Sequence, residues 1–67
     1  MQIKFSENLK RLRAKRKLTQ WDISYELEKT HTVISHWEND RAFPRFLELC
    51  RLADMLKCTL DELVYGD

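Results

Sequence analysis

Two histidines, His31 and His36, are the side chains in this sequence with the widest choice of chemistry. Imidazole can bind a metal ion, transfer a proton or hydrogen-bond another molecule. Two histidines that share one ion on a helix need a spacing of three or four residues, because only that spacing places them on one face. His31 and His36 are five residues apart. We therefore expect no metal ion between them.

Cys50 and Cys58 are the two cysteines of the sequence, and seven residues separate them. This pattern fits neither a disulfide framework nor a zinc motif. Both lie at positions of core type, so we expect two small buried side chains in a reduced, cytoplasmic protein. We expect no cofactor.

Enzymatic chemistry is not indicated. The sequence has no Ser-His-Asp arrangement, glycine-rich phosphate loop or paired carboxylates, and its 67 residues leave no room for a buried pocket. We therefore expect neither an enzyme nor a small-molecule ligand. No apolar run approaches the roughly 18 residues of a membrane span, so we expect no membrane partner.

Charge is distributed unevenly along the chain. The whole sequence has a formal net charge of +1, but its first 20 residues hold seven bases and one acid. Such asymmetry allows one side of a small domain to face a polyanion while the rest stays acidic. A basic, solvent-exposed helix without a nucleic-acid partner is the alternative.

Two short helices are expected around the histidines. Thr19 has the character of an N-cap for a helix that ends near Leu27. Thr30 has the same character for a helix that begins at His31 and extends to about residue 38. Two helices joined by so short a turn must cross steeply, as in a helix-turn-helix.

Three further helices complete an all-α fold of five helices in one domain, residues 1–67. The first is expected over about Ser6–Arg16, and the last opens with a capping box of Thr59 and Glu62. The fourth follows Pro44 and carries an apolar arc of Phe46, Leu49, Cys50, Leu52, Ala53 and Leu56.

A helical wheel divides residues 31–39 into an apolar side and a polar side. Val33, Ile34 and Trp37 form the apolar side. The polar side consists of His31, Thr32, Ser35, His36 and Asn39. Short hydrogen-bonding side chains without a central carboxylate are suited to base edges in a DNA major groove. An ordinary solvent-facing surface is the alternative, although such surfaces are usually dominated by Lys and Glu.

The segment "LTQWDISYELEKTHTVISHWENDRAFP", residues 18–44, resembles the helix-turn-helix core of the phage Cro and lambda-repressor type, often called the XRE family. The flanking "FSENLKRLR" and "LCRLADMLKCTLDEL" are similar to the family's first and last two helices. The resemblance implies a compact five-helix lambda-repressor-like DNA-binding domain. It also implies a transcriptional regulator, in particular a repressor, encoded by a bacterium or phage.

The resemblance also implies roles for single residues. Base reading falls to His31, Thr32, Ser35 and His36. Phosphate contacts fall to Gln20, Lys29, Asn39, Arg41 and Arg45. Gln20 would also brace the first residue of the recognition helix. Arg13 and Glu38 would form a structural ion pair that does not read DNA.

The sequence departs from the family at three turn positions. Glu28, Asp40 and Lys57 stand where glycine is usual. If the turns keep their shape, these residues take positive φ at a cost of roughly 1 kcal/mol each. Lys29 also stands where the family has a hydrophobic turn residue. This replacement removes a core contact and allows the lysine to contact a phosphate.

The expected partner is double-stranded operator DNA with a palindromic sequence, bound by a homodimer. The expected dimer patch consists of Phe43, Leu47, Val64 and Tyr65. Trp21 and Tyr25 lie four apart on the outer side of their helix, beside the DNA backbone or a protein. The alternative function is therefore a protein-interaction module of antitoxin or anti-repressor type with little DNA binding.

Overall fold

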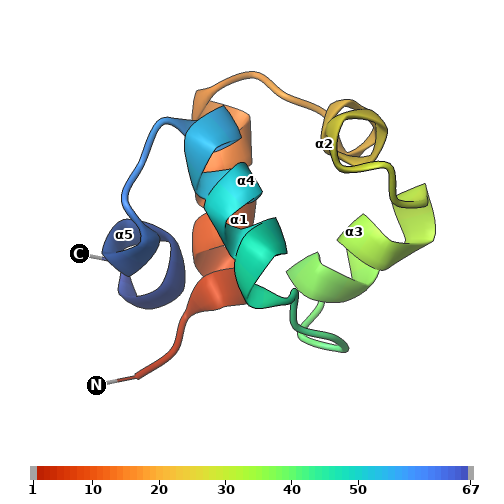
Figure 1. The fold of residues 1–67 in the computed structure, drawn as a ribbon. Coiled ribbons are helices and arrows are strands. Elements are labelled where there is room, and N and C mark those ends of the chain that lie inside the picture. The colour runs from red at the N-terminus through yellow and green to blue at the C-terminus, as the bar shows by residue number, and fades with distance from the viewer. Residues whose placement is uncertain (1, 67) are drawn as a thin grey trace.

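The computed structural model describes residues 2–66, which form five helices (Figure 1). In chain order these are α1 (Phe5–Lys15), α2 (Gln20–Leu27), α3 (His31–Glu38), α4 (Phe46–Leu56) and α5 (Leu60–Tyr65). The expected all-α fold of five helices is confirmed, with the first helix one residue earlier at each end than expected. Across residues 2–66, no helix is both long enough and apolar enough to cross a membrane.

Threonine side chains begin three of the helices. Thr19 Oγ1 accepts a hydrogen bond from the Asp22 amide at 3.1 Å, and the Asp22 carboxylate accepts one from the Thr19 amide at 2.8 Å. Thr30 accepts from the amide of Val33, and Thr59 forms a capping box with Glu62. Each cap satisfies an amide that the first helical turn leaves without a partner. These three predicted helix starts are confirmed.

Left-handed residues end the helices in place of glycine. Glu28, Asp40 and Lys57 have φ of 56°, 61° and 56°, and Lys17, which the sequence did not single out, has 58°. After Glu28, the amide of Lys29 donates to the carbonyl of Ser24 at 2.9 Å. This six-residue bond is the Schellman type of helix end, which requires the left-handed conformation. The turns therefore keep the geometry of a glycine turn, and the backbone of these non-glycine residues is strained.

The core is formed by apolar side chains from all five helices. Its most deeply buried members are Leu9, Ile23, Ile34, Leu52, Leu56 and Leu63. Two expectations about buried side chains were wrong. Phe46 is 65% exposed, because it is the first residue of the helix and lies beyond the edge of the core. Cys50 and Cys58 are half-buried and not fully enclosed.

The helix-turn-helix stands apart from the chain ends. In Figure 1, α2 and α3 lie on one side of the central α1 and α4, whereas α5 and both termini lie on the other. The amide of Lys4 donates to the carbonyl of Val64 at 2.8 Å, and the buried Asn8 side chain donates to the carbonyl of Leu63 at 3.1 Å. These bonds fasten α5 to α1. The termini are therefore remote from the polar side of α3.

Candidate functional site

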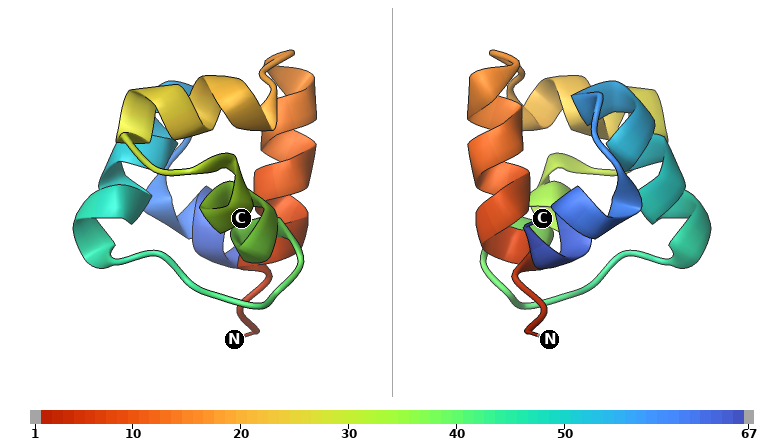
Figure 2. Two further views of the ribbon diagram at one scale, coloured as in Figure 1. Left: turned by 90° about the vertical axis from the view of Figure 1, so that its right-hand side faces the viewer. Right: turned by 90° about the vertical axis from the view of Figure 1, so that its left-hand side faces the viewer.

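The polar side of α3 is accessible, and its apolar side is not. Ile34 and Trp37 are 0% and 3% exposed. On the other side, Thr32 and His36 are exposed and Ser35 is half-buried. Figure 2 (left) shows α3 at the front of the molecule when the right-hand side of Figure 1 faces the viewer. The predicted division of this helix into core and surface sides is confirmed.

A polar hollow adjoins the second half of α3. Ser35, His36, Asn39 and Arg41 line it, and its volume is about 500 Å³. The side-chain Nδ2 of Asn39 donates to the Ser35 carbonyl at 2.8 Å and lies 3.3 Å from Ser35 Oγ. The backbone amide of Arg41 donates to the carbonyl of His36 at 2.9 Å. Four predicted site residues are therefore brought together by the end of one helix and the turn that follows it.

His31 is held differently from the rest of this face. It is half-buried, and its imidazole stacks on the indole of Trp21 from α2, with ring centroids 4.3 Å apart and planes inclined by 16°. Trp21 itself is 65% exposed. The stack joins the outer surface of α2 to the first residue of α3.

Glu38, the last residue of α3, is the centre of a buried polar cluster. Arg13 binds its carboxylate through two nitrogens, with Nε 2.6 Å from Oε2 and an Nη 3.1 Å from Oε1. Gln20 Nε2 also donates to Oε1, at 2.9 Å. Arg13 donates in addition to the carbonyl of Leu18 at 3.0 Å. This cluster connects α1, α2 and α3 around one carboxylate that is 3% exposed.

Gln20 does not brace the first residue of α3 as the resemblance implied. Its side chain is directed to Glu38 at the opposite end of that helix. The deeply buried carboxylate needs several donors, because an ionised group in the interior is costly unless it is fully hydrogen-bonded. Gln20 supplies one of these donors.

Lys29 also has a partner within the chain. Its Nζ lies 2.7 Å from a carboxylate oxygen of Glu48, which links the turn of the helix-turn-helix to α4. This hydrogen bond, together with one from the Arg45 amide, lowers the pKa of Glu48. A phosphate contact from Lys29 would have to compete with this ion pair.

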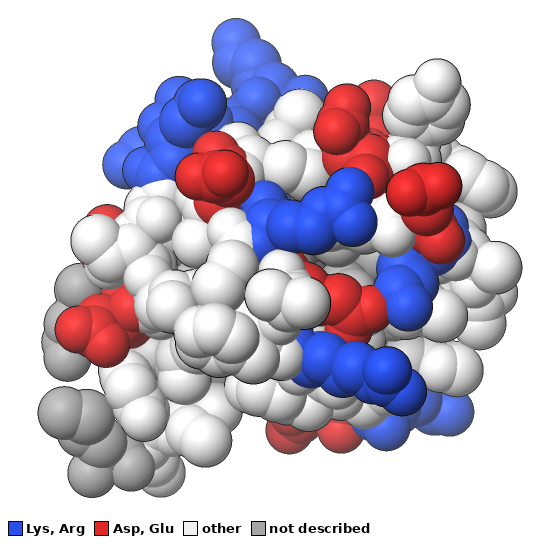
Figure 3. All heavy atoms as spheres, in the orientation of Figure 1, with Lys and Arg blue, Asp and Glu red and all other residues white. Residues whose placement is uncertain are grey.

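Basic side chains gather at one end of the molecule. Figure 3 shows Lys and Arg concentrated at the upper left, over the end of α1 as oriented in Figure 1, and interspersed with Asp and Glu elsewhere on that face. Arg16 fixes the ends of α1 and α4 together by donating to the carbonyl of Leu56 at 3.2 Å. Arg41 in the hollow beside α3 and Arg45 at the start of α4 are exposed. Of the predicted phosphate-binding side chains, these two make the fewest hydrogen bonds and ion pairs within residues 2–66.

The predicted dimer patch is partly exposed. Phe43 and Leu47 are 51% and 73% exposed, whereas Val64 and Tyr65 are half-buried. Phe43 packs on Phe5 with ring centroids 5.1 Å apart. Because Val64 accepts a hydrogen bond from Lys4, both parts of the patch meet the beginning of α1.

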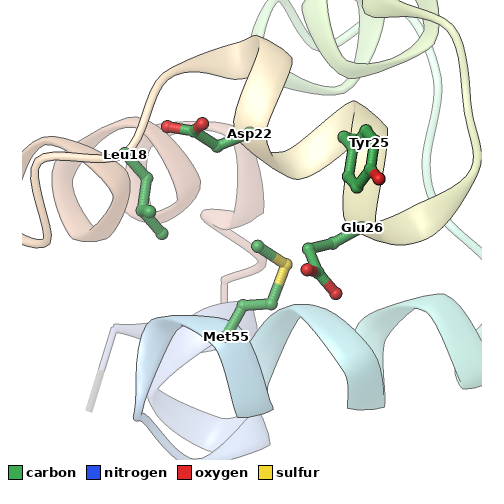
Figure 4. A pocket seen from close by; sticks show the side chains of 5 residues that line it. All are labelled: Leu18, Asp22, Tyr25, Glu26 and Met55. Carbon is green, nitrogen blue, oxygen red and sulfur yellow. The ribbon is translucent and has the colours of Figure 1, made fainter.

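A second hollow lies between α2 and α4, away from the α3 surface. Its volume is about 460 Å³, and it is lined by Leu18, Asp22, Tyr25, Glu26 and Met55. Figure 4 shows Met55 rising from α4 toward α2, with the carboxylate of Glu26 beside it. Tyr25 at its rim is 83% exposed. This hollow is open and mainly apolar, and acidic side chains border it.

Three features of the site were not found from the sequence. The Trp21–His31 stack, the Lys29–Glu48 pair and the direction of Gln20 all connect different helices. No spacing rule predicts such contacts, because they depend on how the helices cross. The left-handed conformation of Lys17 could have been predicted from the sequence, because an apolar residue such as Leu18 commonly follows the left-handed residue of a Schellman turn. No cluster of His, Cys, Asp or Glu suited to a metal ion occurs in residues 2–66.

Comparison with protein families and curated proteins identifies similar chains. The model described as "Helix-turn-helix domain" matches residues 6–66. The HTH-type transcriptional activator BcrR of Enterococcus faecalis is 32% identical over 65 residues, which are 97% of this chain and 32% of that protein. The uncharacterized HTH-type transcriptional regulator YqaE of Bacillus subtilis (strain 168) is 33% identical over 63 residues, 94% of this chain and 54% of that protein. The chain thus spans about a third and about half of these curated relatives.

Solved structures share the same arrangement of helices. A transcriptional regulator from Listeria innocua superimposes with a TM-score of 0.89 at 30% identity, over 96% of this chain and 60% of that chain. The P22 c2 repressor, solved in complex with synthetic operator 9T in the presence of Tl+, gives a TM-score of 0.86 at 28% identity, over 94% of this chain and 96% of that one. The compact five-helix, lambda-repressor-like fold is confirmed.

Proposed function

Because the chain belongs to the helix-turn-helix family of the Cro and lambda-repressor type, we propose that it is a cytoplasmic transcriptional regulator that binds double-stranded DNA sequence-specifically. Residues 1–67 act as one DNA-binding domain, and α3 lies in the major groove. The observation that carries this proposal is the exposed polar side of α3, opposite a side on which Ile34 and Trp37 are buried. The similar P22 c2 repressor was solved with a synthetic operator.

Base reading is assigned to His31, Thr32, Ser35 and His36. Thr32 and His36 are exposed, and their side chains make no hydrogen bond to another part of residues 2–66. Their donors and acceptors are therefore available without the loss of an internal bond. A pair of well-placed hydrogen bonds to a base edge discriminates by about 1–3 kcal/mol.

Phosphate binding is assigned first to Arg41 and Arg45, because both are exposed and Arg41 lies beside the end of α3. Asn39 contributes if phosphate draws its side-chain Nδ2 from Ser35. Gln20 and Lys29 contribute only if phosphate draws them from Glu38 and Glu48. Such contacts set the orientation of a protein on DNA and carry no sequence information themselves.

We further propose that two copies bind a palindromic operator. A domain of this size covers few base pairs, and two-fold dimers place two recognition helices about one helical turn apart. The interface is assigned to Phe43, Leu47, Val64 and Tyr65. Sedimentation with and without the bound duplex tests this assignment, and one copy per duplex at saturation would contradict it.

Repression is the proposed effect on transcription, since a bound dimer denies other proteins access to the DNA that it covers. A reporter gene placed behind the preferred duplex measures the direction. Expression should fall when the protein is produced. Increased expression of the reporter gene would show that the protein is an activator.

The experiment that tests DNA binding is selection from a random duplex library at moderate, fixed salt. The protein should enrich a palindromic sequence, and the double variant His31→Ala and His36→Ala should enrich it weakly or lose the consensus. Asp61→Ala, an exposed change on the remote α5, is the control and should select the same sequence. Enrichment of no duplex by the folded protein would refute the proposal.

One observation favours a second candidate, a protein-interaction module of antitoxin or anti-repressor type. Exposed Tyr25 borders the apolar hollow between α2 and α4, next to acidic Asp22 and Glu26. Acidic side chains disfavour phosphate and suit a basic protein segment. The same selection separates the two candidates, because a protein module would leave the DNA library unenriched.

A further inference from the structure

Trp21 is a large aromatic side chain that contributes little to the core. It is 65% exposed, and it is absent from the buried cluster and from the partly buried residues packed against that cluster. The aromatic contact that it makes is with His31, at a centroid distance of 4.3 Å and an interplanar angle of 16°. A nearly parallel arrangement at this distance places one ring face against the other.

We propose that Trp21 is a positioning residue that fixes the orientation of the His31 imidazole for base reading. This inference rests on the proposed function, because it assigns part of the sequence specificity to a residue outside α3. It concerns the stack alone and not a direct contact between Trp21 and DNA.

The geometry of an imidazole explains why stacking suits this purpose. The two ring nitrogens lie on the edge of the ring, and Trp21 contacts the face. The face can therefore be held while both nitrogens stay free to donate to or accept from a base. A hydrogen bond to another side chain would hold the ring equally well but would occupy one of the nitrogens needed for reading.

His31 has no other internal constraint of this kind. It is the first residue of α3, and Thr30 caps that helix by accepting a hydrogen bond from the Val33 amide. Within residues 2–66, no hydrogen bond involves the imidazole of His31. Gln20, which was expected to brace it, donates to Glu38 instead. Trp21 is therefore the neighbour that orients this side chain.

The stack affects affinity through preorganisation. Immobilising a free side chain on binding costs about 0.5–1.5 kcal/mol, which corresponds to roughly a two- to tenfold loss of affinity. A ring that is already oriented avoids most of that cost. Removal of Trp21 should therefore weaken DNA binding, and it should do so only when His31 is present.

A double-mutant cycle on the duplex selected from the random library tests this dependence. Trp21→Ala should weaken binding about fivefold. His31→Ala should weaken it more, and the double variant should bind no more weakly than His31→Ala alone, because there is no ring left to orient. Trp21→Phe, which keeps an aromatic face, should retain most of the affinity.

Tyr25→Ala is the matched control. Tyr25 lies four residues after Trp21 on the same helix and is 83% exposed, so its removal also deletes an aromatic side chain from the surface of α2. It makes no stack with a proposed base-reading residue. Any effect of Tyr25→Ala on affinity for the selected duplex should therefore be the same with and without His31.

A second readout needs no DNA. In the free protein, the indole ring current should shift the His31 ring protons upfield in the NMR spectrum, and Trp21→Ala should abolish that shift while the Trp37 signals and the folded spectrum persist. A protein without the upfield shift would contradict the stack itself.

The failures of the two proposals can be told apart. If no duplex is enriched, the proposed function fails and this inference fails with it. If a duplex is bound but Trp21→Ala weakens binding equally with and without His31, Trp21 acts on the DNA directly and the inference is wrong. An unchanged affinity of Trp21→Ala would also overturn it.

Discussion

The helix α3 carries two polar regions that are built in opposite ways. At its end, Glu38 is 3% exposed and receives hydrogen bonds from Arg13 and Gln20. On its outer side, Thr32 and His36 are exposed, and their side chains make no hydrogen bond within the part of the chain that the structure describes. One region has all of its bonding capacity used internally. The other keeps its capacity for a partner.

The difference separates a structural role from a binding role. A buried ionised group is costly unless the protein supplies its hydrogen bonds, so the Glu38 cluster fixes how α1, α2 and α3 fit together. An exposed polar group is already hydrated, and replacing it changes stability little. Stability should therefore depend on the first region, and binding on the second.

The largest expected effect is on stability. Glu38→Gln removes the charge that Arg13 and Gln20 surround and leaves their donors poorly matched, so the free energy of unfolding should fall by about 3 kcal/mol. Urea unfolding followed by far-UV circular dichroism measures the change. His36→Ala, on the same helix but exposed, is the control and should alter the midpoint little. A loss below about 1 kcal/mol for Glu38→Gln would show that the Glu38 cluster is not the main interaction holding α1, α2 and α3 together.

The second-largest expected effect is on DNA binding. The double variant Thr32→Ala and His36→Ala should lose about 2 kcal/mol of affinity, or roughly thirtyfold, for the selected duplex, because two of the proposed base-reading side chains are removed. Its free energy of unfolding should change by less than about 0.5 kcal/mol. Fluorescence anisotropy with labelled duplex measures the first quantity and urea unfolding the second. An equal affinity for selected and scrambled duplexes in the unchanged protein would contradict the division of roles.

The turn between α2 and α3 lies before both regions of α3, and its strain should be measurable. Glu28 has φ of 56°, so Glu28→Gly should raise the free energy of unfolding by up to about 1 kcal/mol through relief of the left-handed strain. Glu28→Ala removes the same charge but keeps the strain, so it is the matched control and should not stabilise. Equal effects of both variants would assign the change to charge.

The smallest expected effect concerns Glu48, which lies outside both regions. The ion pair with Lys29, followed by the hydrogen bond from the Arg45 amide, lowers its pKa. Its contribution to stability is therefore present above the ordinary carboxyl pKa and is lost as the pH falls through the lowered value. Urea midpoints should fall less between pH 7 and pH 3 in Lys29→Gln than in the unchanged protein. A larger fall in the variant would contradict this sign.

The helices and their ends could be predicted from the sequence because they are decided locally. Thr19, Thr30 and Thr59 each accept a hydrogen bond from an amide three residues later, so the signal and its partner lie within one turn. The two sides of α3 follow from the period of the helix for the same reason. The three left-handed turns were predicted from a family pattern, and their φ angles agree.

Side-chain partners between helices could not be predicted in the same way. Gln20 bonds to Glu38 and not to His31, and Lys29 pairs with Glu48, 19 positions later in the sequence. Phe46 has the spacing of a core residue but lies past the end of the packed surface. These outcomes depend on the crossing of helices, which no spacing along one helix contains.

The sequence by itself therefore determined five helices, the threonine caps of three of them and the polar side of α3, because capping and helical period act within a few neighbouring residues. Only the tertiary structure decided that Trp21 stacks on His31 and that Gln20 joins the Arg13–Glu38 ion pair, which the family resemblance had implied. The reason is physical. A contact between residues on different helices exists only when packing of the core brings those helices to one angle and distance.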